Sequence, residues 1–309
     1  MSNSGKSAAR KPELQTANTR EVNATRVSRA LRLAYHNGGW ITTKMVALAI
    51  FHTEAKNRLT YAQRLAASAV KAGYLLARRL PTRNQASVYV LTKLGAAWIK
   101  GDLKATGWLP DIRVGTTWGE HNRGKGWRPP TRWLHDERAA RFLCYATHAL
   151  NPSGKATWKA LTESQLRRMN PLEIENFGKC PDGLLVRFGS EKTKAVWVEV
   201  EQSHKTGANR RKLLAHLATL AAGKGPQLRI GSGPFDFARV GKQAFLVFPT
   251  VDSANGFERA AGQWIQRHLG SRLLWQVVID GDDGLKFEMG RVVDMGTPRN
   301  AAHRAAETL

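Results

Sequence analysis

The chain has 309 residues, 42% of them hydrophobic, which is enough for two folded domains of ordinary size. Lys and Arg number 48 against 24 Asp and Glu, so the formal net charge is +24. Two isolated cysteines exclude a disulfide framework, and the longest apolar run, Met45 to Phe51, is too short to span a bilayer. Without an apolar leader, a cytoplasmic, nucleoid-associated protein with no membrane partner is expected.

The charge is concentrated in the first third of the chain, where residues 1–104 carry a net +14. Basic side chains displace the counterions of phosphate groups, so this excess favours a nucleic acid as partner. A basic but merely soluble surface is the alternative. Residues 1–18 have almost no large apolar side chains, and we expect them to form a disordered basic arm.

Residues 19–104 show the element order of a winged helix-turn-helix. Apolar spacing predicts three helices, and two β-like runs then flank a turn. The predicted elements are helices over 20–35, 43–51 and 55–72, strands over 74–80 and 86–92 around the turn 81–85, and a last helix over 94–99. The third helix would enter the major groove of double-stranded DNA, and the hairpin would follow the adjacent backbone.

The predicted DNA contacts come from the polar side of the third helix and from the hairpin. Arginine can bind a guanine or a phosphate with two hydrogen bonds, and asparagine can recognise adenine. The candidate residues are Asn57, Arg58, Tyr61, Arg64 and Lys71 on the helix and Arg78, Arg79 and Arg83 on the wing. A helical protein-interaction module, for instance a homodimer interface, is the alternative for this region.

Residues 105–130 are rich in Trp, Gly and Arg and poor in aliphatic side chains. This composition predicts a connector of neither helix nor strand. Its tryptophans would anchor it to a surface, or alternatively stack on unpaired bases.

Residues 131–295 predict a second, α/β domain, followed by a mobile tail over 296–309. The fold class expected for the whole chain is α+β or α/β, with a mixed sheet in the second domain. The predicted elements are a helix over 131–150, an ambiguous stretch over 165–175, strands over 183–188 and 195–200, a helix over 210–222, a strand over 244–248, a helix over 256–269, and strands over 273–279 and 285–293.

Carboxylates stand at neighbouring ends of two of these strands. Asp182 opens the first strand of the hairpin, and Glu199 and Glu201 end the second on one face, because side chains alternate along a strand. Paired carboxylates form a hard oxygen site for Mg²⁺ or Mn²⁺, which can activate water and stabilise charge at a phosphate. Taken singly, Asp182 also fits a turn residue and Glu199 an exposed, ion-paired strand residue.

This pattern resembles the PD-(D/E)XK nuclease superfamily, with its restriction-endonuclease-like core of a helix, a hairpin carrying Asp and then Glu-x-Lys, a helix and a strand. The resemblance covers about residues 131–250. It implies Asp182 and Glu199 as metal ligands, the Val200 carbonyl as a third oxygen, and Asp136 or Glu137 as a helix acid. The chain departs from the pattern at Glu201, where Lys is usual. Lys205 or Lys212 would then supply the positive charge.

His135 and His204 could approach these carboxylates in space, although each is more typical of a structural hydrogen-bonding residue. The order of Leu91-Thr92-Lys93-Leu94-Gly95, His135-Asp136, Pro181-Asp182-Gly183, Val198-Glu199-Val200-Glu201 and Arg211-Lys212-Leu213 also resembles the replication-relaxation proteins of plasmids and conjugative elements. These pair a winged helix with a nuclease-like domain.

Two functions are therefore expected as alternatives. One is a metal-dependent DNA endonuclease or nickase of a mobile element, which the winged helix directs to its site. The other is a catalytically silent DNA-binding regulator or accessory factor of plasmid replication, transfer or transcription, which acts with other DNA-processing proteins.

Overall fold

The structure of the chain is a computed structural model. It describes residues 11–52, 56–80, 87–104, 120–122, 126–151, 157–187, 194–201, 207–230, 233–236, 243–268, 274–281 and 283–293. Over these residues it has a mixed α+β fold with nine helices, a small antiparallel sheet and a six-stranded mixed, curled sheet, besides two short hairpins. In the same part of the chain, no helix is both long and apolar enough to cross a membrane.

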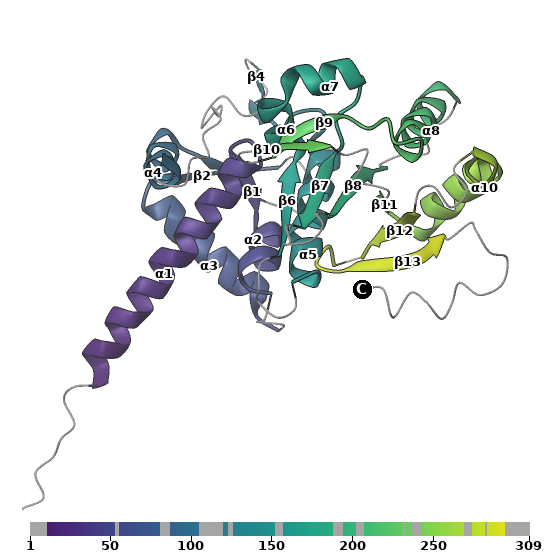
Figure 1. The fold of residues 1–309 in the computed structure, drawn as a ribbon. Coiled ribbons are helices and arrows are strands. Elements are labelled where there is room, and N and C mark those ends of the chain that lie inside the picture. Colours follow the sequence, from purple (N-terminus) through teal and green to yellow (C-terminus); the bar gives the residue numbers. More distant parts are fainter. Residues whose placement is uncertain are drawn as a thin grey trace, which may run out of the picture.

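The N-terminal module spans the helices and strands up to residue 104 and lies beside the large sheet (Figure 1). Its strands form an antiparallel sheet in the order β1-β3-β2. The elements are α1 (Lys11–His36), β1 (Trp40–Thr42), α2 (Thr43–Ile50), α3 (Arg58–Lys71), β2 (Leu75–Arg79), β3 (Ser87–Leu91) and α4 (Lys93–Lys104).

Local sequence signals place these elements. Gly38 and Gly39 take positive φ angles after α1, a conformation that glycine adopts without strain. The Thr42 side chain accepts a hydrogen bond from the Met45 N–H at the start of α2, as an N-cap residue does. The apolar side of α3 is buried as predicted, with Ala62, Leu65, Ala66 and Ala69 in the core.

Three features of this module differ from the expectation. Helix α1 begins at Lys11, so residues 11–18 are helical rather than part of a disordered arm, and residues 1–10 lie outside the described residues. Strand β1 was not expected, because its three residues form a strand only by pairing with β3. The predicted turn 81–85, with Arg83, is outside the described residues.

The second module is built on the six-stranded sheet, in the order β13-β12-β11-β8-β7-β6. Strand β8 pairs antiparallel with β7 and parallel with β11. Its elements are α5 (Trp133–Ala149), β6 (Trp158–Thr162), α6 (Glu163–Met169), α7 (Pro171–Phe177), β7 (Gly183–Arg187), β8 (Lys194–Val200), α8 (Gly207–Ala221), β9 (Gln227–Ile230), β10 (Gly233–Asp236), β11 (Gln243–Phe248), α10 (Val251–His268), β12 (Leu274–Asp280) and β13 (Phe287–Val293).

Sequence patterns missed β6 and the hairpin of β9 and β10. The ambiguous stretch 165–175 forms two helices, α6 and α7, that meet at Asn170, because Pro171 fits the first turn of a helix and not its interior. Within the predicted connector, β4 (Glu120–Asn122) pairs with β5 (Gly126–Arg128), contrary to the expectation of no strand. Residues 105–119 and the tail 296–309 are outside the described residues.

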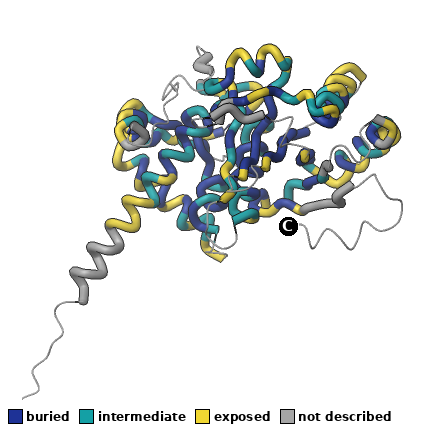
Figure 2. Tube along the Cα trace, viewed as in Figure 1, coloured by how far each residue is buried: buried dark blue, intermediate teal, exposed yellow. Residues whose placement is uncertain are grey.

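Helices cover both faces of the large sheet, so the central strands are buried (Figure 2). On one face lies α5, whose Phe142 and Leu143 pack with Val196 and Val198 of β8. On the other face, side chains of α6, α7, α8 and α10 form a second cluster around Trp197 of β8.

Helix α5 also packs against the N-terminal module. Trp133, Ala140 and Cys144 belong to the same hydrophobic cluster as the helices α1 to α3, and the Trp133 and Trp40 rings lie 4.9 Å apart. The Thr162 hydroxyl donates to the His36 carbonyl oxygen at 2.6 Å. The core of the N-terminal module is therefore shared with α5, while the large sheet has further clusters of its own.

Candidate functional site: a buried carboxylate cluster

Strand pairing brings Asp182 and Glu199 to the same end of the sheet. Gly183 of β7 stands opposite Val198 of β8, and the Asp182 N–H donates to the Val198 carbonyl oxygen at 3.0 Å. The next residue on each strand is therefore Asp182 on one and Glu199 on the other. The expected proximity of these two positions is confirmed, and both side chains are buried.

Alternation along β8 decides which face carries the glutamates. Ala195 and Trp197 belong to the cluster under α6, α7 and α8, whereas Val198 and Val200 face α5. Glu199 and Glu201 continue the row of Trp197, and their residues are only 0% and 2% exposed. They are thus buried on the face that α6, α7 and α8 cover.

Asp182 is held by both the sheet end and α5. Its Oδ2 accepts the Val200 N–H at 2.8 Å and lies 3.2 Å from His135 Nε2. Its Oδ1 is 3.8 Å from Arg132 Nη2. Burial by itself would raise the pKa of Asp182, but the hydrogen bond and the charge of His135 hold this pKa below the usual range.

Glu199 is paired with Lys179, from the segment between α7 and β7. Lys179 Nζ lies 2.7 Å from Glu199 Oε2, and the Trp197 indole N–H donates to Oε1. Complete burial and the neighbouring charge of Asp182 nevertheless raise the pKa of Glu199 to about 7. Burial lowers the pKa of Lys179, but Glu199, Asp182 and Glu201 outweigh this and raise it. Lys179 therefore contacts Glu199 and also feels the charges of Asp182 and Glu201.

The start of α5 supplies the remaining cations. His135 Nδ1 lies 3.1 Å from Asp136 Oδ1, so its ring stands between Asp136 and Asp182. Burial lowers the pKa of His135, but the hydrogen bonds to the two aspartates raise it to about 9, and the ring is an imidazolium at neutral pH. Arg132 Nη2 also donates to Glu163 Oε2 at 3.2 Å.

The donor set fits Mg²⁺ or Mn²⁺ only in part. Among the described residues, no three His, Cys, Asp or Glu side chains are placed to share a metal ion, so there is no protein cage for Zn²⁺ or Ca²⁺ in this part of the chain. Mg²⁺, however, commonly uses one or two carboxylates and completes its shell with water and substrate phosphates. Asp182 and Glu199 are two buried carboxylates of this kind, at the junction of neighbouring strands.

Of the other predicted site residues, Asp136 is separated from Asp182 by the His135 ring and does not join the carboxylate pair. Lys212 is exposed on α8, and Lys205 lies outside the described residues, as does His204. Sequence analysis missed Lys179 and Arg132 and placed little weight on His135. Lys179 stands three positions before Asp182, and this nearness in the sequence could have indicated that Lys179 belongs to the site.

The predicted DNA-contacting residues lie on α3 and β2. Asn57, Arg64, Lys71 and Arg79 are exposed, and Arg58 and Arg78 are half-buried. Tyr61 differs from the expectation of an outward side chain, because it packs against the core with its ring 5.8 Å from that of Phe51.

Fold and site together define a mixed α+β protein with a basic composition and a buried cluster of carboxylates and cations at one end of its large sheet. Comparison with protein-family models, with curated proteins and with solved structures found no match for this chain.

Proposed function

We propose that this chain binds double-stranded DNA through its N-terminal module and cleaves a phosphodiester bond at the carboxylate cluster, with Mg²⁺ or Mn²⁺. The observation that carries the proposal is the group of Asp182, Glu199 and Lys179 at the adjoining ends of β7 and β8. Carboxylates can hold a divalent ion that activates water at a phosphate, and a lysine beside them can offset negative charge there.

DNA binding is supported by the topology and charge of the N-terminal module. Three helices and a sheet of order β1-β3-β2 are the elements of a winged helix, with α2 and α3 as its helix-turn-helix. Helix α3 carries exposed Arg64 and Lys71, which suit base edges and phosphates in a major groove. The net charge of +24 supplies long-range attraction.

Each side chain of the cluster has a task in this proposal. Asp182 and Glu199 would hold the divalent ion, which would lower the pKa of a bound water and stabilise charge on the phosphate. Lys179 is placed to neutralise a phosphate oxygen as negative charge develops. It supplies the positive charge that was sought at Lys205 or Lys212. His135 and the Val200 N–H hold Asp182 in place.

The restriction-endonuclease-like layout agrees with this assignment. A helix, α5, lies on one face of a sheet in which β7 and β8 form the acid-bearing hairpin, and α8 and β11 follow. The likeness to replication-relaxation proteins would make the chain part of a plasmid or conjugative element.

A second function is favoured by a different observation. Asp182 is engaged by His135 and the Val200 N–H, and Glu199 by Lys179 and Trp197, so protein partners already satisfy the two carboxylates. In this second function, the sole role of the network is structural: it holds the ends of β7 and β8 together. The chain would then be a silent DNA-binding regulator or accessory factor of plasmid replication, transfer or transcription.

The deciding experiment incubates supercoiled plasmid with the protein and Mg²⁺ or Mn²⁺. We expect nicked or linear product from the wild type, and a loss of at least about 100-fold in rate for Asp182→Asn and for Glu199→Gln. Glu258→Gln on α10, outside the cluster, is the matched control for the loss of one carboxylate. Cleavage that survives both cluster variants would remove this site, and no cleavage with any divalent ion would favour the silent DNA binder.

The DNA-binding half is tested separately by the salt dependence of binding. If Arg64 and Lys71 contact phosphates, Arg64→Ala and Lys71→Ala should each reduce the slope of log K against log salt by about 1. Arg259→Ala, which removes an exposed charge from α10, should leave the slope unchanged. Equal slopes for all three variants would show that α3 is not the recognition helix.

A further inference from the structure

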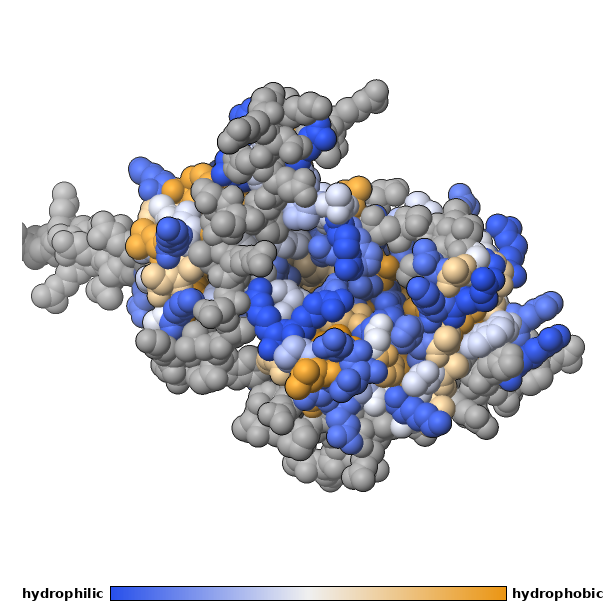
Figure 3. Space-filling view, turned by 90° about the horizontal axis from the view of Figure 1, so that it is seen from above, coloured by the Kyte–Doolittle hydropathy of each residue, from blue (hydrophilic) through white to orange (hydrophobic). Residues whose placement is uncertain are grey.

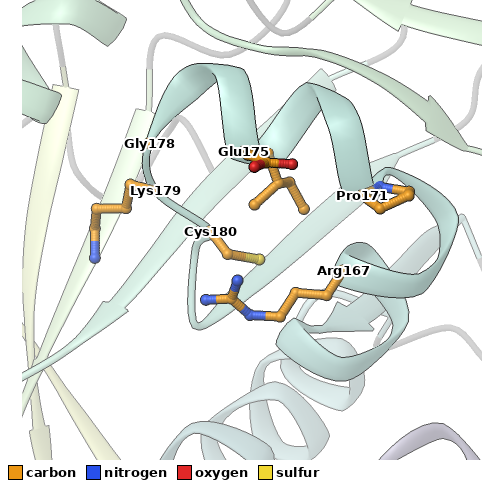
Figure 4. A pocket seen from close by; sticks show the side chains of 7 residues that line it. Arg167, Pro171, Glu175, Gly178, Lys179 and Cys180 are labelled. Carbon is orange, nitrogen blue, oxygen red and sulfur yellow. The ribbon is translucent and has the colours of Figure 1, made fainter.

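A cavity of about 470 Å³ lies next to the carboxylate cluster. It is formed where α6 and α7 meet the segment that leads into β7, and Figure 4 shows its lining from close by. The lining residues are Arg167, Pro171, Ile174, Glu175, Gly178, Lys179 and Cys180. Seen from above, the face of the molecule that carries these helices is mainly hydrophilic (Figure 3).

Lys179 joins the cavity to the cluster. Its side chain lines the cavity, while its Nζ lies 2.7 Å from Glu199 Oε2. A molecule in the cavity is therefore one lysine side chain away from the carboxylates. Any substrate whose reacting phosphate sits at the cluster would place a neighbouring unit at the cavity.

The charges of the lining suit a phosphate. The guanidinium of Arg167 points into the space beside Cys180 (Figure 4). Its Nε and one terminal nitrogen bind Glu163 Oε1 at 2.8 and 2.7 Å, which leaves further N–H groups of the guanidinium for a ligand. Arginine with spare N–H groups in a fixed orientation is well suited to phosphate oxygens.

The rest of the lining suits a nucleobase. Pro171 supplies exposed apolar surface on α7 next to the almost fully buried Ile174, and Glu175 adds a carboxylate that can accept a hydrogen bond from an amino group. Ligand sites of a few hundred Å³ typically combine such apolar walls with a few polar groups. The cavity volume exceeds what inorganic phosphate alone would fill.

We propose that this cavity binds one nucleotide of the DNA strand, next to the phosphate held at the carboxylate cluster. Its phosphate lies toward Arg167 and Lys179, and its base packs on Pro171 with an amino group donating to Glu175. This subsite rests on the proposed function, because that function supplies the strand. A base stacked in a duplex cannot enter a cavity, so the nucleotide is unpaired, and the substrate near the cleaved bond is single-stranded or opened DNA.

The test measures binding of deoxycytidine monophosphate to the full-length protein without metal, by calorimetry or saturation-transfer NMR. Inorganic phosphate and deoxycytidine are the comparison ligands. The nucleotide should bind more tightly than either, and Arg167→Gln should weaken it about tenfold, the value of one charge-assisted hydrogen bond. Glu175→Gln should lower the preference for deoxycytidine monophosphate over thymidine monophosphate about fivefold, because one acceptor for the cytosine amino group is changed.

Arg259→Gln and Glu258→Gln make the same charge changes on α10 and should leave the affinity unchanged. The proposal is overturned if the nucleotide binds no more tightly than inorganic phosphate, or if Arg167→Gln and Arg259→Gln behave alike. The plasmid assay separates this result from the cleavage function. Nucleotide binding without cleavage would support the nucleotide subsite and contradict the cleavage function. Cleavage without nucleotide binding would contradict the subsite and leave the cleavage function supported.

Discussion

The pKa of Glu199 depends on most of the residues in the carboxylate cluster. It is completely buried, it has Asp182 as a negatively charged neighbour, and only Lys179 and the Trp197 N–H favour its ionised form. Burial and the charge of Asp182 outweigh the effects of Lys179 and the Trp197 N–H, so the pKa of this carboxyl is raised to about 7. Replacing buried ionic pairs by well-packed apolar residues is often neutral or stabilising in other proteins, so this network need not add stability.

This residue predicts a pH-dependent stability. The ordinary pKa of the carboxyl is 4.5 and the folded value is about 7, so between these values the folded state holds a proton that the unfolded chain releases. Stability is therefore lost as the pH rises through this window. Relative to Glu199→Gln, the wild type should lose about 2 kcal/mol of unfolding free energy between pH 5 and pH 8.

Urea denaturation at the two pH values measures this difference, with Glu258→Gln as the control for removing one negative charge. Parallel changes of the wild type and Glu199→Gln would mean that Glu199 does not titrate in this window. His135 has the same sign in a higher pH window. Its pKa is raised to about 9, so its contribution is complete below pH 6.5 and is lost as the pH rises through 9.

At the scale of elements, close packing of backbone against backbone sets the position of α4 in the N-terminal module. The Gly95 N–H donates to the Thr92 hydroxyl, which in turn donates to the Gly73 carbonyl oxygen. A Cβ atom at Gly95 would overlap the Tyr74 carbonyl oxygen, which belongs to the backbone and cannot rotate away. Gly101, on the same helix, has no atom of the described residues within 4 Å of its would-be Cβ.

These two glycines make a matched pair of substitutions. Gly95→Ala should destabilise the protein by about 1–3 kcal/mol, because α4 must move away from the β2 end. Gly101→Ala should be neutral or stabilise by up to about 1 kcal/mol, since alanine favours helix. Thermal unfolding of both variants checks this, and equal effects at the two sites would contradict the packing described for α4.

The central element is α5, which lies between the N-terminal helices and the large sheet. Its buried Arg141 donates to Asp280 Oδ1 at 2.8 Å and to Glu137, so the charge is paired on both sides. The start of the same helix holds His135 against Asp182. One helix thus connects the proposed DNA-binding module, the sheet and the carboxylate cluster.

For the whole molecule, the shared core predicts a single cooperative unfolding transition. Trp133 packs its ring against Trp40 and belongs to the N-terminal cluster, although it lies in the second module. Trp133→Ala should therefore lower the unfolding free energy of both modules together, by about 3–5 kcal/mol. Circular dichroism and tryptophan fluorescence should report coincident midpoints for the wild type and the variant. Two separate transitions would show that the modules fold independently.

The sequence predicted most regular elements because their signals are local. Apolar spacing identified α3, α5 and β8, and the Pro-Asp-Gly and Glu-x-Glu segments located Asp182, Glu199 and Glu201. Short or edge strands such as β1 and β6 were not predicted, because they form only by pairing with β3 and β7. Lys179 was not predicted as a site residue for a related reason. No sequence pattern indicates which side chain of an irregular segment will lie against a neighbouring strand.

What the sequence determined by itself is the basic charge, the alternation that places Glu199 and Glu201 on one face of a strand, and the succession of helices and strands, since these depend on composition and on neighbours along the chain. Only the tertiary structure decided that Glu199 and Glu201 are buried, that Lys179 pairs with Glu199, that His135 reaches Asp182, and that α5 packs against both modules. These contacts depend on how distant segments pack, and the free energy of packing is set by shape and burial in three dimensions.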